Sequence, residues 1–167
     1  MPEIDPTQLA DWFEAYGPRL VLYARQWVDG PAAEDAVQET FARLMAQGQP
    51  PRSPQAWLFR SVRNAAINLL RKVGRRRRRL EDFARGSQPL FEADPADLLD
   101  ASAVQRALEG LDEVHREVVV LKIWGGLALR EIAAVTGRPI STLSFQYQSA
   151  LDDIRKKMGE PCRTKKG

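Results

Sequence analysis

The hydrophobic residues of this chain recur at three- and four-residue spacing over most of its length, which predicts amphipathic helices. The clearest pattern begins at Ser53-Pro54, a typical helix cap followed by proline at the first helical position. A single apolar stripe follows it: Leu58, Val62, Ala65, Ala66, Leu69 and Val73. We therefore expect a long helix that buries this stripe.

Two further helices are expected ahead of it. Asp5-Pro6 opens the first, and the turn Asp29-Gly30-Pro31 opens the second. The first helix has the expected core residues Leu9, Trp12, Phe13, Tyr16, Leu20, Ala24 and Trp27, with a kink or short break near Gly17-Pro18. The second has the expected core residues Val37, Phe41, Leu44 and Met45. Together the three helices predict one compact all-α unit.

The helical pattern stops between Gly74 and about Asp94, in a stretch that changes from basic to acidic and is typical of a linker. It resumes after the Asp94-Pro95 cap with Leu98, Leu99, Val104, Ala107, Leu108 and Leu111. After Asp112 it continues to Gly125-Gly126 with Val114, Val118, Leu121, Ile123 and Trp124. We expect an all-α chain of two small helical domains, residues 1–74 and 95–160, joined by a linker at 75–94 and followed by a tail at 161–167.

The last part of the chain predicts a short helix, a turn and a longer helix. The short helix holds Leu129, Ile132 and Ala133, and the turn is Gly137-Arg138-Pro139. The inward positions of the longer helix are Leu143, Tyr147, Ala150, Leu151, Ile154 and Met158. This is the pattern of a helix-turn-helix, whose second helix enters the major groove of DNA. An ordinary hairpin of two helices would show the same pattern, and periodicity alone does not separate the two.

The composition limits the kinds of catalytic or metal site that this chain can form. Cys162 and His115 are the only residues of their types among 167, which excludes a disulfide framework and argues against a zinc site or a Cys–His or Ser–His catalytic pair. We expect neither an enzyme nor a cofactor. The N-terminus has no apolar core typical of a signal peptide, and no stretch approaches the length of a membrane span, so a cytoplasmic protein without membrane association is expected.

The charge of the long helix is one-sided. No Asp or Glu occurs between Ser53 and Arg79, and the face opposite the apolar stripe carries Arg60, Arg63, Asn64, Asn68, Arg71 and Arg75. Cations with interspersed amides suit a nucleic-acid backbone with base edges nearby. A solvated helix followed by a disordered charge run is the alternative. Trp57, near the start of the helix, is either a core residue or a platform for base stacking.

The second helix carries a different polar face. Asp35, Gln38 and Glu39 occupy positions i, i+3 and i+4, so they share one outward face. A generic acidic surface would look the same, so this face alone does not identify a binding site.

Three stretches of the chain resemble the extracytoplasmic-function sigma factors, group IV of the sigma-70 family, which are subunits of bacterial transcription initiation. They are AAEDAVQETFARL at 32–44, PQAWLFRSVRNAAINLLRKVGRRRR at 54–78 and LDEVHREVVVLKIWGGLALREIAAVTGRPISTL at 111–143. The resemblance implies a sigma region 2 bundle in the first domain and a region 4 helix-turn-helix in the second. It also implies core RNA polymerase and promoter DNA as partners, and leaves open an anti-sigma factor.

The resemblance also assigns residues. Asp35, Gln38 and Glu39 would dock on the clamp helices of the polymerase, and region 4 would contact its flap. The −10 element would be held by Trp57, Arg60, Arg63, Asn64, Asn68 and Arg71. For the −35 element, the helical wheel of the longer helix turns Ser141, Phe145, Gln148 and Ser149 outward, and together with Arg138 and Thr142 they are the expected contacts.

Two departures from the family pattern concern the DNA surfaces. Asn68 stands where the family usually has Asp, and the longer helix of the helix-turn-helix lacks the Lys and Arg that usually follow Thr142. One alternative to a sigma factor is a stand-alone helix-turn-helix regulator. Another is a sigma-derived protein-interaction module, which the missing cations favour. An enzyme is a weaker alternative, because the carboxylates form no paired motif.

Overall fold

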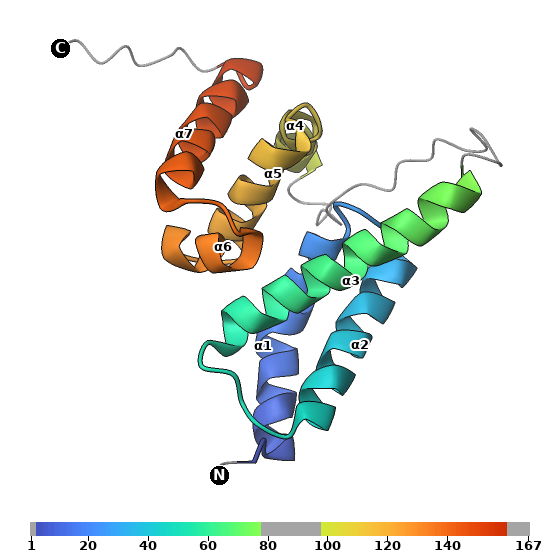
Figure 1. Ribbon diagram of the computed structural model, residues 1–167. Coiled ribbons are helices and arrows are strands. Elements are labelled where there is room, and N and C mark those ends of the chain that lie inside the picture. The colour runs from blue at the N-terminus through green and yellow to red at the C-terminus, as the bar shows by residue number, and fades with distance from the viewer. Residues whose placement is uncertain (1–2, 78–97, 160–167) are drawn as a thin grey trace. The chain divides into compact units, whose positions relative to one another are not determined.

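The computed structural model describes residues 3–77 and 98–159, and the regular elements in these ranges are helices (Figure 1). They form two compact units. The first is built on α1 (Pro6–Ala24), α2 (Gly30–Gln47) and α3 (Pro54–Arg77). The second is built on α4 (Leu98–Glu109), α5 (Glu113–Val119), a π-helical turn (Val120–Trp124), α6 (Leu129–Thr136) and α7 (Ile140–Lys157). The predicted all-α fold is confirmed.

The expected boundary at Gly74 falls inside α3, which continues to Arg77. The rest of the predicted linker, the Asp94-Pro95 cap and the tail lie outside the described residues. In the described ranges, no helix is both long and apolar enough to span a bilayer.

In the first unit, α1 and α2 are antiparallel and α3 lies across both (Figure 1). The predicted starts of α1 and α2 are confirmed, because Asp5 accepts a hydrogen bond from the Thr7 amide and Asp29 accepts one from the Ala32 amide. These caps satisfy amides that have no partner inside the helix. They are local features, which is why the sequence alone reveals them.

Of the predicted kink or short break near Gly17-Pro18, the break is wrong, because α1 runs through Pro18 to Ala24. Proline removes one hydrogen bond to the carbonyl of residue i−4, here Glu14. Both Pro18 and Glu14 are exposed, so water can hydrogen-bond that carbonyl. Beyond the proline, Leu20 and Tyr23 are fully buried, and their burial holds the last turns of the helix in place.

The core of the first unit contains aromatic residues that the predicted stripes miss. Tyr23 of α1 and Phe59 of α3 are fully buried, and their ring centroids lie 5.6 Å apart. The stripe of α3 is otherwise as expected at Leu58, Val62, Ala65 and Ala66. In α2, Met45 is wrongly predicted as core, since 64% of it is exposed. The buried positions of α2 are Ala33, Ala36, Val37, Thr40, Phe41 and Leu44, and Met45 lies at the edge of this stripe.

The second unit has its own core. A cluster of Leu108, Leu111, Val119 and Ala150 joins α4, α5 and α7, with Val104, Trp124, Tyr147 and Ile154 packed against it. Asp112 caps α5 by accepting a hydrogen bond from the His115 amide at 2.8 Å. Met158, predicted inward, is exposed at the end of α7.

The end of the α5 segment is a wide π-helical turn. The Gly125 amide donates to the Val120 carbonyl at 2.9 Å, and a β-carbon at Gly125 would lie 2.5 Å from the Leu121 carbonyl oxygen. Glycine is therefore required at this close approach. A π turn shifts the following residues around the helix axis. Ile123, predicted as core, is exposed, while Trp124 is half-buried and packs against the core of the unit. Val114, also predicted as core, is exposed in the first turn of α5.

The turn between α6 and α7 has the expected sequence chemistry. Gly137 ends α6 with φ +73°, a left-handed conformation that favours glycine. Pro139 follows, and α7 begins at Ile140. Ile132 of α6 and Leu143 of α7 are fully buried, which fixes the faces that these helices present to the core.

Candidate nucleic-acid and partner interfaces

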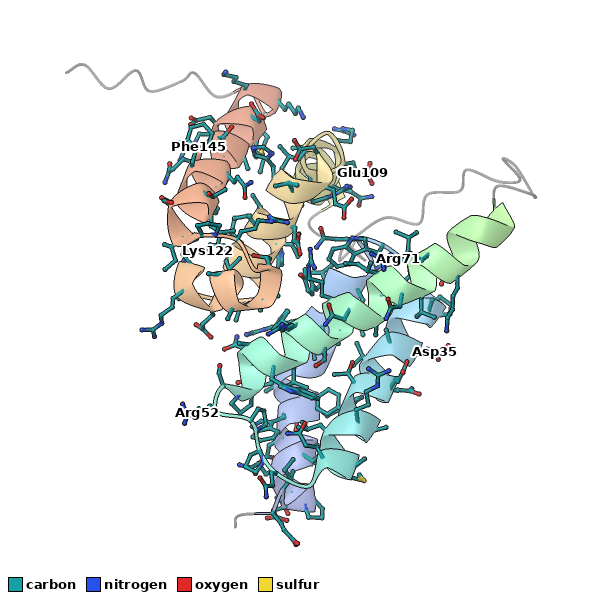
Figure 2. The ribbon with its side chains drawn as sticks, in the orientation of Figure 1. Asp35, Arg52, Arg71, Glu109, Lys122 and Phe145 are labelled. Atoms are coloured by element: carbon teal, nitrogen blue, oxygen red, sulfur yellow. The ribbon has the colours of Figure 1, made fainter. Side chains whose placement is uncertain are left out.

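One face of α2 is acidic and exposed. Asp35, Gln38 and Glu39 are all exposed, while Val37 and Leu44 on the other side are buried. Figure 2 shows Asp35 on this helix. Glu39 forms an exposed ion pair with Arg43, with 2.6 Å between the Glu39 Oε1 and the Arg43 Nη2. The ion pair is local, so Asp35 and Gln38 are better placed than Glu39 to meet a partner.

An acid-free polar stripe runs along α3. Arg60, Asn64, Asn68 and Arg71 are exposed and follow one another at spacings of four, four and three residues. Arg71 is labelled on α3 in Figure 2. Trp57 is half-buried and precedes Arg60 by three residues, so it lies at the start of the same face. The stripe therefore combines two amides, two guanidinium groups and one accessible aromatic edge.

Arg63 is placed differently from the other cations of α3. Its side chain is half-buried, and its guanidinium lies 5.9 Å from the centroid of the Trp27 ring. Trp27 in turn contacts Tyr23 edge-on, with 5.0 Å between ring centroids. Arg63 is therefore part of an aromatic cluster that links the end of α1 to α3.

The outward face of α7 is neutral. Ser141, Thr142, Phe145 and Gln148 are exposed, and Ser149 is half-buried. Phe145 is 75% exposed, and Figure 2 shows it on the side of α7 that faces away from α4 and α5. In α7, the first basic residue is Arg155, in the last turn. The first half of this helix therefore offers hydrogen-bonding groups and one apolar ring but no positive charge.

Arg138, predicted to contact DNA from the turn, is held by its own domain. Its Nη2 donates to the buried carboxylate of Glu117 in α5. Its Nη1 lies 3.3 Å from the Val114 carbonyl and 3.4 Å from the Gln146 Oε1. Only 19% of its side chain is exposed. The structure thus separates Arg138 from the exposed residues of α7.

Glu117 was missed by the sequence interpretation. It lies four residues before Leu121, which is fully buried, so it falls on the buried face of its helix. An acidic residue on that face has to find a cation when it is buried, because an isolated buried carboxylate is very costly. The spacing was visible in the sequence, but the identity of the cation, 21 residues away, was not.

Comparison with known proteins identifies the class of both units. Residues 12–77 match the Sigma-70 region 2 family and residues 101–154 match the Sigma-70 region 4 family. The hairpin of α6 and α7 is therefore the helix-turn-helix of a sigma region 4, and the unit of α1 to α3 is a sigma region 2.

The chain is also similar to individual sigma factors. It is 29% identical over 163 residues to the ECF RNA polymerase sigma factor RpoE of Cereibacter sphaeroides, covering 92% of this chain and 88% of the relative. It is 30% identical over 123 residues to EcfG of Rhodopseudomonas palustris, covering 71% and 66% of the two chains. Among solved structures, the sigma factor RpoE of Bartonella quintana, crystallised with the anti-sigma factor NepR, gives a TM-score of 0.75 at 23% identity and covers 92% of this chain and 98% of that one.

This chain belongs to the extracytoplasmic-function sigma factors, the RNA polymerase subunits that direct promoter recognition and transcription initiation. The stand-alone regulator is not favoured, because the first unit is a sigma region 2 rather than a sensing or dimerisation domain.

Proposed function

We propose that α3 holds the non-template strand of the −10 element through the stripe of Arg60, Asn64, Asn68 and Arg71. The observation that carries this proposal is the exposure of all four side chains on a helix whose opposite side is buried and which has no acidic residue. Guanidinium groups bind phosphates without reading sequence, whereas amides can form paired hydrogen bonds with a base edge. Trp57 would support an unstacked base at the start of the stripe.

We propose further that the exposed face of α2 docks on the clamp helices of core RNA polymerase. Asp35 and Gln38 are the main contacts, and Glu39 contributes where its ion pair with Arg43 opens. An exposed ion pair contributes only about 0.2–1 kcal/mol, so a basic partner surface can displace it.

For the second unit, we propose that α7 contacts the −35 duplex through Ser141, Thr142, Phe145, Gln148 and Ser149, and that the unit also meets the polymerase flap. Phe145 is suited to a thymine methyl group and Gln148 to an adenine edge. Because the face lacks cations, this contact is weak alone and matters once the first unit is anchored.

An anti-sigma factor is proposed as a regulatory partner. A solved sigma factor of similar fold, RpoE, was crystallised with the anti-sigma factor NepR, and CnrH, also of similar fold, was solved in complex with the cytosolic domain of CnrY. The protein would act in the cytoplasm, without catalytic activity or cofactor of its own.

The test combines the full-length protein with core bacterial RNA polymerase and a genomic fragment library. We expect copurification with the core enzyme and initiation from a subset of fragments that share a −10 element. Single-stranded oligonucleotides carrying that element should then bind the holoenzyme in a sequence-dependent manner. Initiation without a shared −10 element would contradict the role proposed for α3.

A further inference from the structure

We infer that Arg138 is a positioning residue for α7, and that it acts through Glu117 and Gln146 instead of touching DNA. This role rests on the proposed reading of the −35 element by α7. Its basis is one guanidinium that joins three groups: the Glu117 carboxylate, the Val114 carbonyl and the Gln146 amide oxygen. The first two belong to α5 and the third to the second turn of α7.

The geometry of arginine suits this role. A guanidinium is planar and carries five N–H donors in a fixed fork, so it constrains both distance and direction. Arg138 lies in the turn between α6 and α7, and its contacts connect that turn to α5 on one side and to α7 on the other. Apolar contacts such as Leu143 and Ala150 keep α7 on the core but are not directional. The hydrogen bonds of Arg138 therefore fix the angle at which the outward face of α7 is presented.

Burial makes the connection to Glu117 strong. Only 1% of the Glu117 side chain is exposed, and a carboxylate at that depth has to stay paired. The same pairing neutralises the charge of Arg138. A phosphate would have to compete with a buried carboxylate for a guanidinium that is itself mostly covered. Arg138 thus contributes orientation to the DNA surface and little positive charge.

Positioning and phosphate contact predict different results for Glu117→Gln. If Arg138 touched phosphate, removing the neighbouring negative charge would strengthen binding to every DNA. If Arg138 positions α7, weakening its main partner should reduce discrimination between −35 sequences. The probe is a promoter fragment selected by the wild-type holoenzyme, together with a copy in which only the −35 element is scrambled. We expect the ratio of their affinities to fall about three- to tenfold in Glu117→Gln, the size typical of residues that act through a network.

A paired variant separates positioning from stability. Replacing a buried ion pair by apolar residues of similar volume is often neutral or stabilising. Glu117→Leu combined with Arg138→Met should therefore melt at or above the wild-type temperature, yet it has no guanidinium to hold Gln146 and the Val114 carbonyl. We expect its −35 discrimination to stay reduced, and the slope of log affinity against log salt to match the wild type. If Arg138 bound a phosphate, its replacement would instead lower that slope by about one.

A milder variant keeps the test decisive if the paired variant does not fold. Gln146→Ala removes only the α7 end of the connection, at a half-buried position. It should lower the discrimination ratio with little change in melting temperature. Gln105→Ala on α4 is the matched control, because Gln105 is also a half-buried glutamine whose side chain forms a hydrogen bond, donated to Glu109 within its own helix, but it lies outside the turn. It should leave the ratio unchanged.

Three results would overturn the inference. They are wild-type discrimination in the paired variant, wild-type discrimination in Gln146→Ala, and a salt slope lowered by about one in the paired variant. If the wild-type holoenzyme itself does not distinguish the two fragments, the proposed reading by α7 fails and this role fails with it. If the wild type distinguishes the two fragments and every variant does so equally well, only the role inferred for Arg138 is wrong.

Discussion

The Arg63 guanidinium lies 5.9 Å from the centre of the Trp27 ring, so the one half-buried arginine among the described side chains of α3 connects this helix to the turn that follows α1. A cation over a tryptophan face stabilises by about 0.5–1 kcal/mol at exposed sites and more when desolvated. Arg60, three residues earlier, is exposed. The two arginines therefore serve different purposes although they share one helix and one charge.

The first prediction compares these two residues. Arg63→Ala should lower the free energy of unfolding by about 1 kcal/mol, because it removes the cation from Trp27. Arg60→Ala should change it by less than about 0.5 kcal/mol, as is usual for exposed positions. In the holoenzyme, Arg60→Ala should lower the salt slope of −10 strand binding by about one, and Arg63→Ala by less. Urea unfolding and a salt titration check both. Equal effects of the two variants in both measurements would contradict this assignment.

A second prediction concerns the amides of α3. Asn64→Ala and Asn68→Ala should each relax the preference for one base, by about 1–3 kcal/mol where the hydrogen bonds are paired. Arg71→Ala should weaken binding to all sequences alike. A panel of single-stranded −10 oligonucleotides, each with one base changed, measures both effects. The distinction between amides and guanidinium groups is wrong if the three variants give the same profile across the panel.

Docking on the polymerase gives a third prediction. Asp35→Ala combined with Gln38→Ala should weaken binding to core RNA polymerase while changing stability by less than about 0.5 kcal/mol per site. The Glu39–Arg43 ion pair lies on the same helix, so Arg43→Ala is a useful companion. It frees the Glu39 carboxylate and should leave docking unchanged or strengthen it. Copurification of the double variant with core enzyme at wild-type affinity would show that α2 docks through another face.

The sequence predicted the features that depend on a few neighbouring residues. The helix starts at Asp5 and Asp29, the start of a helix after Asp112 and the turn at Gly137 depend on adjacent residues, so residue type and spacing suffice to find them. The exposed stripe of α3 follows from helical periodicity in the same way.

Other features depend on residues far apart in the chain. Tyr23 is buried because Phe59 of a different helix packs against it, and the helical segment after α5 ends in a π turn where Gly125 closely approaches the Leu121 carbonyl. The pairing of Glu117 with Arg138 joins two helical segments through a turn. None of these follows from the periodicity of a single helix, which assumes a regular turn and cannot specify a partner.

The cap of α5 gives a prediction about pH. The His115 backbone amide, followed by its side chain, lowers the pKa of Asp112 below the usual aspartate value. A carboxyl whose folded pKa is depressed contributes stability above its unfolded pKa of about 3.9 and loses it as pH falls through the folded pKa. Asp112→Ala should therefore lower the free energy of unfolding by about 1 kcal/mol near pH 7. On acidification, this variant should lose less stability than the wild type.

Asp112→Asn is the matched control for this effect. Asparagine caps a helix about as well as aspartate but does not titrate. It should keep most of the neutral-pH stability and still lose the acid dependence of the wild type. Urea unfolding of the three proteins between pH 3 and 7 measures the difference. A wild-type profile in Asp112→Asn would mean that another group causes the acid dependence.

The last prediction concerns the neutral face of α7 and where a cation can be added to it. Ser144 is exposed, so Ser144→Lys adds a charge without disturbing the core. It should strengthen −35 binding and steepen the salt slope by about one. Gln146→Arg adds the same charge two residues later, but it places a guanidinium beside Arg138 and removes the acceptor at 3.4 Å. We expect this variant to lose stability and −35 discrimination despite its extra charge.

Removing side chains from the same face of α7 tests its role in the opposite direction from adding charges. Truncating an exposed ring should not destabilise the fold, so Phe145→Ala should melt like the wild type and still lower −35 discrimination, most strongly at a thymine. Gln148→Ala should act at an adenine position instead. Holoenzyme binding to fragments with single −35 substitutions checks both. If the double variant Phe145→Ala plus Gln148→Ala binds the promoter as well as the wild type, α7 does not read DNA through this face. A protein partner would then be favoured, because an exposed aromatic ring on a neutral helix face is also suited to a protein surface.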